Sequence, residues 1–310
     1  MNLEETKRKL AGVAVTPPTP FSEDGDSVLY DELRENVAYL VDAGIPVLLP
    51  CGNTGEYYSL SDDERVRIVE QTAAAAGDDA AVVAGAGGST KHVLQLADRY
   101  REAGADGIML MHPGHTYVHR DGLRRYFERI AAGTELGVVL YKRGPEVMDE
   151  LLVDLTEIEN VVGVKYAVND VSAFSRAVER SSGDAVWSNG IAERFAPSFL
   201  FEGAKGFTSG IGAFVPELPL ALMEALRNGE WARARQLREL ARPYEELRDG
   251  TGPNSPFASA NNVPAVKYGM ELAGLYGGPV REPLTGLSEA DEERAEALYR
   301  EITERLPKLS

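Results

Sequence analysis

The chain has 310 residues, a formal net charge of −17 and a single cysteine, Cys51. So negative a chain is a poor partner for nucleic acid or an anionic membrane, because phosphate groups would repel it. One cysteine cannot form an intramolecular disulfide, which fits a reducing compartment. No apolar run approaches the roughly 18 to 20 residues of a membrane span, and the first ten residues are charged throughout. We therefore expect a cytoplasmic protein that binds neither nucleic acid nor membrane.

Most of the chain alternates between predicted strands and helices, after a short polar lead at the N-terminus. Short apolar segments predict strands at 11–15, 47–50, 81–84, 107–111, 137–141, 161–165, 184–188 and 206–209. Apolar residues at helical spacing predict helices between them, the best defined at 30–43, 61–77, 89–102, 122–132 and 146–158. Eight strands alternating with helices over about 210 residues match a (β/α)8 TIM barrel, whereas a doubly wound open sheet usually has fewer strands.

The C-terminal part has a different pattern. Helices are predicted at 217–228, 231–247, 263–275 and 290–306 with no strands between them, and a Gly-, Pro-, Ser- and Asn-rich linker at 249–262 interrupts them. We therefore predict an α/β fold in two parts, a barrel over residues 1–225 and a C-terminal helical extension over residues 226–310.

One lysine stands at the end of an apolar strand, in the run Val161-Val162-Gly163-Val164-Lys165. Only 8 of the 32 basic residues are lysine, which makes Lys165 more noticeable in this acid-rich chain. A desolvated amine has a lowered pKa and can attack a carbonyl carbon, although a strand-end lysine can equally extend its amine into solvent. Tyr141 ends the preceding strand, and neighbouring strands lie about 4.8 Å apart, so the two side chains can share one cavity. A phenol beside an amine can transfer protons.

Other polar residues follow predicted strands at the end where barrel active sites lie. They are Gly52-Asn53-Thr54-Gly55-Glu56 after the second strand and Ser188-Asn189-Gly190 after the seventh. The Gly-rich run 85–89 could hold a phosphate, but it lacks the dinucleotide spacing, so a tight turn is the better interpretation.

Several spaced motifs resemble the dihydrodipicolinate synthase and N-acetylneuraminate lyase family. They are Gly52-x-x-Gly55-Glu56, Leu140-Tyr141, Val162-Gly163-Val164-Lys165 and the run from Leu275 to Leu284. This resemblance runs from about Gly12 to the end of the chain. It implies a (β/α)8 barrel, usually a homotetramer, that acts on a pyruvate-type 2-keto acid through a lysine imine, with no other cofactor and no metal.

The resemblance also implies roles for individual residues. Lys165 would form the Schiff base and Tyr141 would shuttle the proton. The substrate would be bound by Gly52, Asn53, Thr54, Gly55, His115, Arg143, Asn189, Gly190 and Thr208. Glycines in the first loop would let backbone N–H groups approach the keto-acid carboxylate.

Three positions depart from the synthase pattern. Asn53 stands where the family carries Thr or Ser, His115 stands where synthases carry a tyrosine that reaches a neighbouring subunit, and Glu146 stands at the aligned arginine position. These departures favour aldol cleavage or dehydration of a 2-keto-3-deoxy sugar acid over dihydrodipicolinate synthesis. The synthase reaction stays as the alternative, and a non-catalytic binding or regulatory barrel is the alternative of another class.

The sequence allows more than one function for two further groups of residues. His112, His115 and His119 have a spacing that can suggest a metal site, but they lie in a predicted loop without clustered carboxylates, so we expect no metal. Lys142 and Arg143 could bind a sugar-acid carboxylate or phosphate, or could be an ordinary solvated pair. Glu56 is interpreted as a structural carboxylate rather than a general base.

Overall fold

The structure is a computed structural model that describes residues 1–111, 113–252 and 256–309. Eight parallel strands form a closed barrel in sequence order, with β1 paired to β8. The strands are β1 (Val13–Val15), β2 (Val47–Leu48), β3 (Ala81–Ala86), β4 (Gly107–Leu110), β5 (Gly137–Lys142), β6 (Val161–Tyr166), β7 (Val186–Asn189) and β8 (Gly206–Ser209). All eight predicted strands are confirmed within about two residues. Most are apolar runs buried on both faces, whereas β7 and β8 end in polar residues and are partly exposed.

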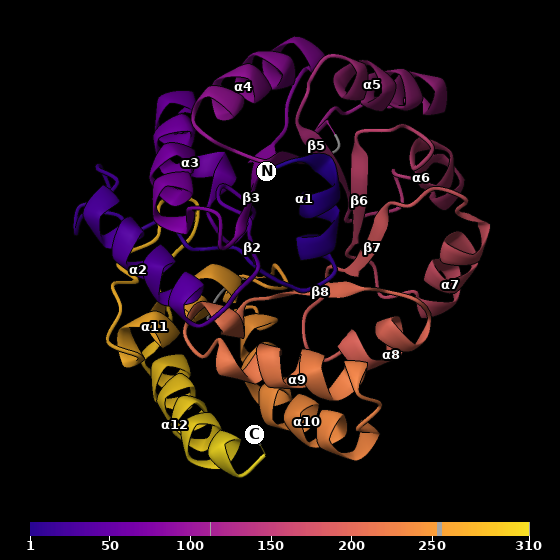
Figure 1. Cartoon of the computed structure of the whole chain (residues 1–310). Helices are drawn as coiled ribbons and strands as arrows, with labels where there is room; N and C mark the ends of the chain where they lie inside the picture. Colours follow the sequence, from indigo (N-terminus) through magenta and orange to yellow (C-terminus); the bar gives the residue numbers. More distant parts are fainter. Residues whose placement is uncertain (112, 253–255, 310) are drawn as a thin grey trace.

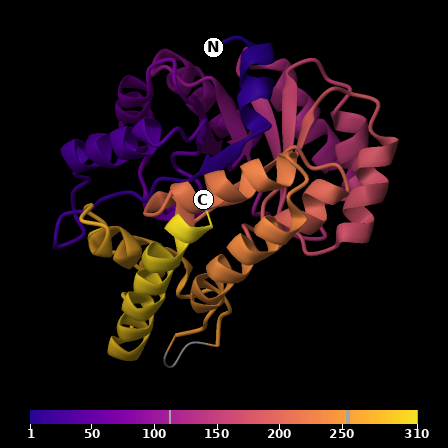
Figure 2. The same cartoon turned by 60° about the horizontal axis from the view of Figure 1, so that its bottom comes forward.

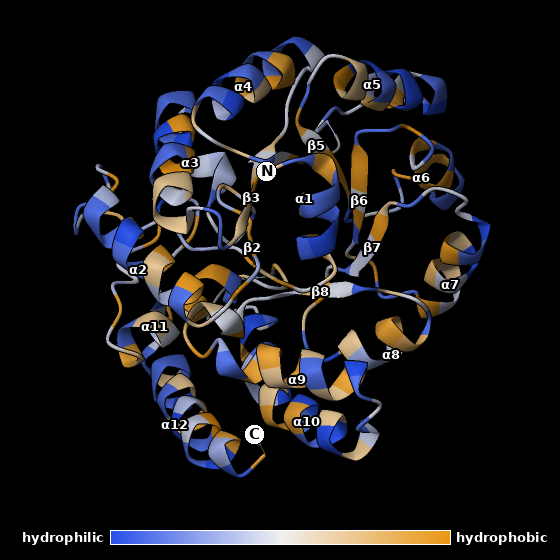
Figure 3. Ribbon diagram, viewed as in Figure 1, coloured by the Kyte–Doolittle hydropathy of each residue, from blue (hydrophilic) through white to orange (hydrophobic). Residues whose placement is uncertain are grey.

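Helices surround the barrel, as Figure 1 shows. They are α2 (Tyr30–Asp42), α3 (Asp62–Ala76), α4 (Thr90–Glu102), α5 (Arg120–Ala132), α6 (Asp149–Leu155), α7 (Val171–Arg180), α8 (Ala196–Phe201) and α9 (Glu217–Arg227). Their outer faces are hydrophilic, and apolar residues face the sheet (Figure 3). Helix α3 begins with a capping box in which Ser61 and Glu64 bind each other's backbone N–H groups.

The polar N-terminal lead, for which no element was predicted, is a helix. Helix α1 (Leu3–Leu10) begins at Asn2, whose side chain accepts a hydrogen bond from the Glu5 amide. It lies across one end of the barrel (Figure 1) and contacts β3, β6 and β7. Charged residues outnumber apolar ones in this segment, so its sequence reads as polar although Leu10 is buried.

The C-terminal helices follow α9 without intervening strands, as predicted. They are α10 (Trp231–Arg248), α11 (Asn262–Leu272) and α12 (Glu289–Arg305). Helix α10 packs on α9 and α12. Helices α10, α11 and α12 lie on the side of the barrel away from the end that α1 covers (Figure 2). The predicted linker falls partly on residues 253–255, which lie outside the described residues. Among the described residues, no helix is long and apolar enough to cross a membrane.

Candidate active site

A cavity of about 620 Å³ lies at the C-terminal ends of the strands, with Lys165 and Tyr141 in its lining. We call it the lysine cavity. It also includes Asn53, Thr54, Arg143, Gly190 and Thr208, so most of the predicted site residues lie together. The parallel register explains the central pair, because Tyr141 on β5 stands beside Lys165 on β6. The Lys165 Nζ lies 4.7 Å from the centroid of the Tyr141 ring.

Burial makes the amine of Lys165 a weak base. Burial and, to a smaller extent, the positive charge of Arg143 together lower the pKa of Lys165 from its ordinary value to about 8. Gly190 makes room for the lysine, since a Cβ at that position would lie 3.0 Å from the Lys165 Cγ. A neutral amine is therefore far more accessible here than on an exposed lysine.

The hydroxyl of Tyr141 is held by Asn53. The Asn53 Nδ2 donates a hydrogen bond to the Tyr141 hydroxyl oxygen at 3.0 Å. Burial raises the pKa of Tyr141, while Arg143 and the Asn53 hydrogen bond oppose that rise. Near neutral pH the phenol is protonated and can donate a proton or pass one on. Asn53 thus orients the hydroxyl, although an amide cannot relay a proton as a hydroxyl would.

The loop after β2 presents free backbone donors. The amides of Asn53, Thr54 and Gly55 donate no hydrogen bond to any described residue, whereas the Tyr57 amide returns to the Gly52 carbonyl at 3.2 Å. Gly52 and Gly55 do not line the cavity; they allow tight packing, because a Cβ at Gly55 would lie 3.2 Å from the Cys51 nitrogen. Such a loop can bind a carboxylate.

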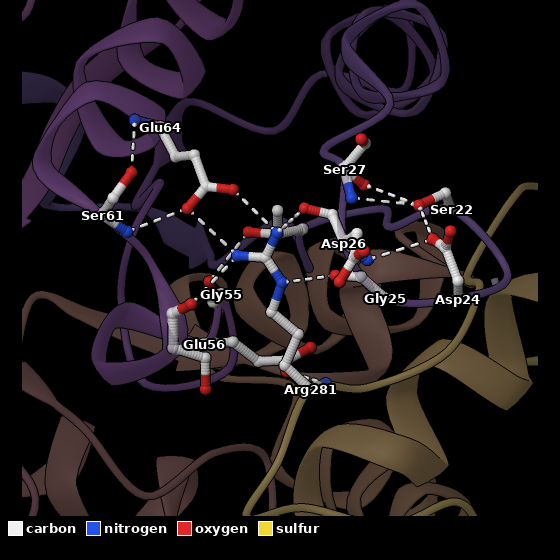
Figure 4. A network of polar contacts seen from close by, with 12 residues as sticks. Ser22, Asp24, Gly25, Asp26, Ser27, Gly55, Glu56, Ser61, Glu64 and Arg281 are labelled. Atoms are coloured by element: carbon white, nitrogen blue, oxygen red, sulfur yellow. Dashed lines mark hydrogen bonds and ion pairs between the residues drawn. The ribbon is translucent and has the colours of Figure 1, made fainter.

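Glu56 holds this loop to the C-terminal segment. Its carboxylate forms a buried ion pair with Lys267 of α11 at 2.7 Å and accepts a hydrogen bond from the Arg281 amide at 2.9 Å. The Arg281 guanidinium binds both carboxylate oxygens of Glu64 and the carbonyls of Gly25 and Asp26 (Figure 4). Lys267 was missed in the sequence, although a lysine within the apolar run of α11 was a signal for a buried ion pair.

Besides Gly52 and Gly55, the predicted site residues Asn189 and His115 lie outside the lining of the lysine cavity, and so does Glu146, one of the three departures from the synthase pattern. Asn189 is fully buried, and its side chain binds the Ala192 carbonyl and the Ile191 amide, so it shapes the loop after β7 instead of facing the cavity. Glu146 is exposed and outside the cavity lining, so it does not stand where a substrate-binding arginine was expected. Exposed His115 lines a different hollow of about 750 Å³ beside α5.

The structure also places the two described histidines of the predicted loop, and both members of the Lys142 and Arg143 pair. The Nδ1 atoms of His115 and His119 accept hydrogen bonds from the amides of Tyr117 and Asp121. His112 lies outside the described residues, and within the described part no group of three His, Cys, Asp or Glu side chains could hold a metal ion. Lys142 is neither solvated nor in the cavity, since it is buried and pairs with Asp149 at 2.8 Å. Arg143 is exposed and lines the cavity.

Residues of the C-terminal helices complete the lining and were missed in the sequence. Glu245, Arg248 and Asn262 from α10 and α11 face the cavity, together with Arg194 from the loop after β7. Glu245 accepts hydrogen bonds from the amides of Glu193 and Arg194, both at 2.8 Å, which fixes α10 over the barrel. The extension therefore contributes to the site and is not an appendage. Sequence spacing could not show this, because these residues are distant from the motifs in the chain.

A barrel with a lysine amine at a strand end fits a class of enzyme, the lyases that bind a 2-keto acid as a lysine imine. The dihydrodipicolinate synthetase family model matches residues 9–302, and the chain belongs to this family. The protein is thus a lyase of this family, and its closed eight-stranded barrel is the fold that the resemblance implied.

Named relatives carry two activities. A 4-hydroxy-tetrahydrodipicolinate synthase from Methanopyrus kandleri is 32% identical over 300 residues, 95% of this chain and 96% of the relative. A probable 5-dehydro-4-deoxyglucarate dehydratase 2 from Streptomyces coelicolor is 35% identical over 285 residues, 91% of this chain and 86% of the relative. The crystal structure of dihydrodipicolinate synthase from Bacillus clausii matches with a TM-score of 0.90 and 35% identity, covering 96% of this chain and 99% of that one.

Proposed function

We propose that the protein dehydrates a 2-keto-3-deoxy sugar acid through an imine at Lys165. The observation that carries the proposal is the buried amine with a pKa lowered to about 8, on the strand beside Tyr141. The named dehydratase relatives support the choice of substrate. Counted from the carboxylate beside its ketone, 5-dehydro-4-deoxyglucarate is a 2-keto-3-deoxy sugar acid with a second carboxylate at the far end.

The residues can carry each step. The neutral Lys165 amine adds to the C2 ketone, water leaves, and an iminium ion forms. Loss of a C3 proton gives the enamine, whose electron pair expels the C4 hydroxyl as water once that group is protonated. Tyr141, held by Asn53 at 3.0 Å, is the group placed to move these protons. Aldol cleavage would also proceed through the imine and an enamine, but the C3–C4 bond would break instead of the bond between C4 and its hydroxyl oxygen.

The substrate contacts follow from the free groups in the lysine cavity. The unpaired amides of Asn53 and Thr54, which line the cavity, would bind the carboxylate next to the ketone. Thr208 and Arg143 line the same cavity and would bind hydroxyl or carboxylate groups further along the substrate. Gly52 and Gly190 would act by leaving space rather than by direct contact.

The second candidate is 4-hydroxy-tetrahydrodipicolinate synthesis, which the Methanopyrus relative and the Bacillus structure favour by name. The position of Glu146 outside the cavity also removes one argument against it. A single panel separates the candidates: 5-dehydro-4-deoxyglucarate, a keto-deoxy acid without the second carboxylate, and aspartate semialdehyde with pyruvate. We expect rapid consumption of 5-dehydro-4-deoxyglucarate. Dehydration followed by decarboxylation of this compound would yield carbon dioxide and 2-oxoglutarate semialdehyde. Efficient dihydrodipicolinate formation would instead select the second candidate.

Assembly and location belong to the same proposal. A homotetramer in the cytoplasm follows from the family resemblance, and the exposed Tyr117 and Val118 beside the α5 hollow are compatible with a subunit contact. Light scattering at several protein concentrations measures the assembly. A mass of about 34 kDa at every concentration would contradict it, since the chain mass is 33.6 kDa.

A further inference from the structure

The lysine cavity contains a buried cation that lacks a counterion. Arg248 is only 7% exposed, yet it lines the cavity. The other buried cations have partners: Lys9 binds two carbonyl oxygens, Lys142 pairs with Asp149 and Lys267 pairs with Glu56. In the described part of the chain, no carboxylate lies within 4.0 Å of the Arg248 guanidinium. Buried charges are normally paired, so this guanidinium calls for an explanation.

Arginine cannot resolve the problem by losing its proton. The Lys165 amine loses its proton more readily than an ordinary lysine, as its lowered pKa indicates, but a guanidinium stays charged under all ordinary conditions. Its hydrogen bonds are also incomplete. Only the Asn262 Oδ1 accepts from Arg248, at 3.2 Å, and the buried Nε has no acceptor among the described residues. The group therefore has both charge and donors available for a ligand.

The other charged residues around Arg248 do not supply the missing counterion. The Glu245 carboxylate is occupied by the amides of Glu193 and Arg194. Both oxygens of Glu245 are thus taken by backbone donors, and among the described residues Glu245 forms no ion pair with Arg248 within 4.0 Å. Burial and the nearby Glu193 raise the pKa of Glu245 well above its ordinary value, while the charge of Arg248 and the Arg194 amide oppose that rise. Arg194 differs from Arg248 because it is paired with Asp249.

The backbone is shaped to hold Arg248 at this place. A Cβ at Gly210, directly after β8, would lie 2.2 Å from the Arg248 Cζ, so the guanidinium packs against the glycine backbone. Gly210 has φ −98°, which any residue can adopt, so its lack of a side chain matters for space and not for backbone conformation. The planar fork of arginine matches a carboxylate in two-point contact.

We propose that Arg248 binds the terminal carboxylate of a sugar diacid whose ketone end is attached to Lys165. This inference rests on the proposed function and deepens it, because it makes the enzyme selective for diacids over keto acids with an uncharged end. The contact is made in the ground state, and the carboxylate it holds is the one that can leave as carbon dioxide. Removing Arg248 should therefore raise KM and leave kcat unchanged or higher.

The test compares two six-carbon keto acids that differ only at the far end, 2-oxoadipate and 2-oxohexanoate. Imine formation is measured by borohydride trapping, which needs no turnover. In Arg248→Gln the half-saturating concentration of 2-oxoadipate should rise about 10- to 100-fold, the range for lost hydrogen bonds to a charged group. That of 2-oxohexanoate should change less than about threefold. Arg242→Gln, on the exposed face of the same helix, is the matched control and should leave both values unchanged.

A second variant protects the test against misfolding. Gly210→Ala keeps the charge but forces the guanidinium away, so it should produce the same selective loss; trapping with pyruvate, which has no distal carboxylate, reports that the site is intact. Equal weakening of both six-carbon acids, or loss of selectivity in Arg143→Gln alone, would overturn the assignment to Arg248. Because trapping is independent of turnover, a protein that prefers 2-oxoadipate but does not dehydrate the sugar diacid would refute only the proposed function.

Discussion

The nucleophile at Lys165 should become neutral at a much lower pH than an ordinary lysine. Its pKa of about 8 lies about 2.5 below the ordinary 10.5. At pH 7 about one amine in eleven is then neutral, against about three in ten thousand for an unperturbed lysine, a gain of roughly 300-fold in reactive amine.

Imine formation with pyruvate, trapped by cyanoborohydride between pH 6 and 10, measures this directly. The rate at low pyruvate should rise about tenfold per pH unit and level off above pH 8. In Arg143→Gln the midpoint should move to higher pH, because the positive charge of Arg143 helps to lower the pKa of Lys165. A rate that continues to rise through pH 10 would refute the argument that burial prepares this amine.

The remaining predictions concern turnover and stability. Tyr141→Phe should lower kcat by about 10² to 10⁴ with little change in KM, and steady-state kinetics with unchanged kcat would remove Tyr141 from proton transfer. Lys165→Met should stabilise the protein by up to about 3 kcal/mol at pH 7. The sign follows from the lowered folded pKa, because the folded state binds fewer protons than the unfolded state between about pH 8 and 10.5, so the penalty is full below pH 8 and fades above it. Urea unfolding at pH 7 and pH 10 checks this, and an equal gain at both would contradict it. Lys267→Met should destabilise by about 3 to 5 kcal/mol by leaving Glu56 buried without its partner. A Lys267→Met/Glu56→Gln double variant should recover part of that loss, and no recovery would mean that the ion pair is not the cause.

The barrel and the central pair could be predicted because both depend on local patterns. Apolar runs mark the strands, and parallel register brings Tyr141 and Lys165 together once the strand order is known. Asn189 could not be placed correctly, because its burial depends on hydrogen bonds within the loop after β7. The family resemblance likewise placed Glu146 at a substrate-binding position, whereas the structure places it outside the cavity lining.

The part of the lysine cavity formed by the C-terminal helices could not be predicted from local sequence patterns, for a physical reason. Arg248 and Asn262 reach the cavity only because α10 and α11 fold back over the strand ends, held by Glu245 and by the Lys267–Glu56 pair. Such contacts join residues separated by more than 50 positions, and no periodicity records them. The uncompensated charge of Arg248 becomes visible only when its surroundings are known.

The central claim is that Lys165 forms a covalent imine, and peptide mass spectrometry after borohydride reduction with pyruvate tests it most directly. The peptide that contains Lys165 should gain the mass of one reduced pyruvate adduct, and Lys165→Arg should take up none while unfolding with normal cooperativity, since arginine remains charged. An adduct at another lysine, or full turnover by Lys165→Arg, would contradict the account.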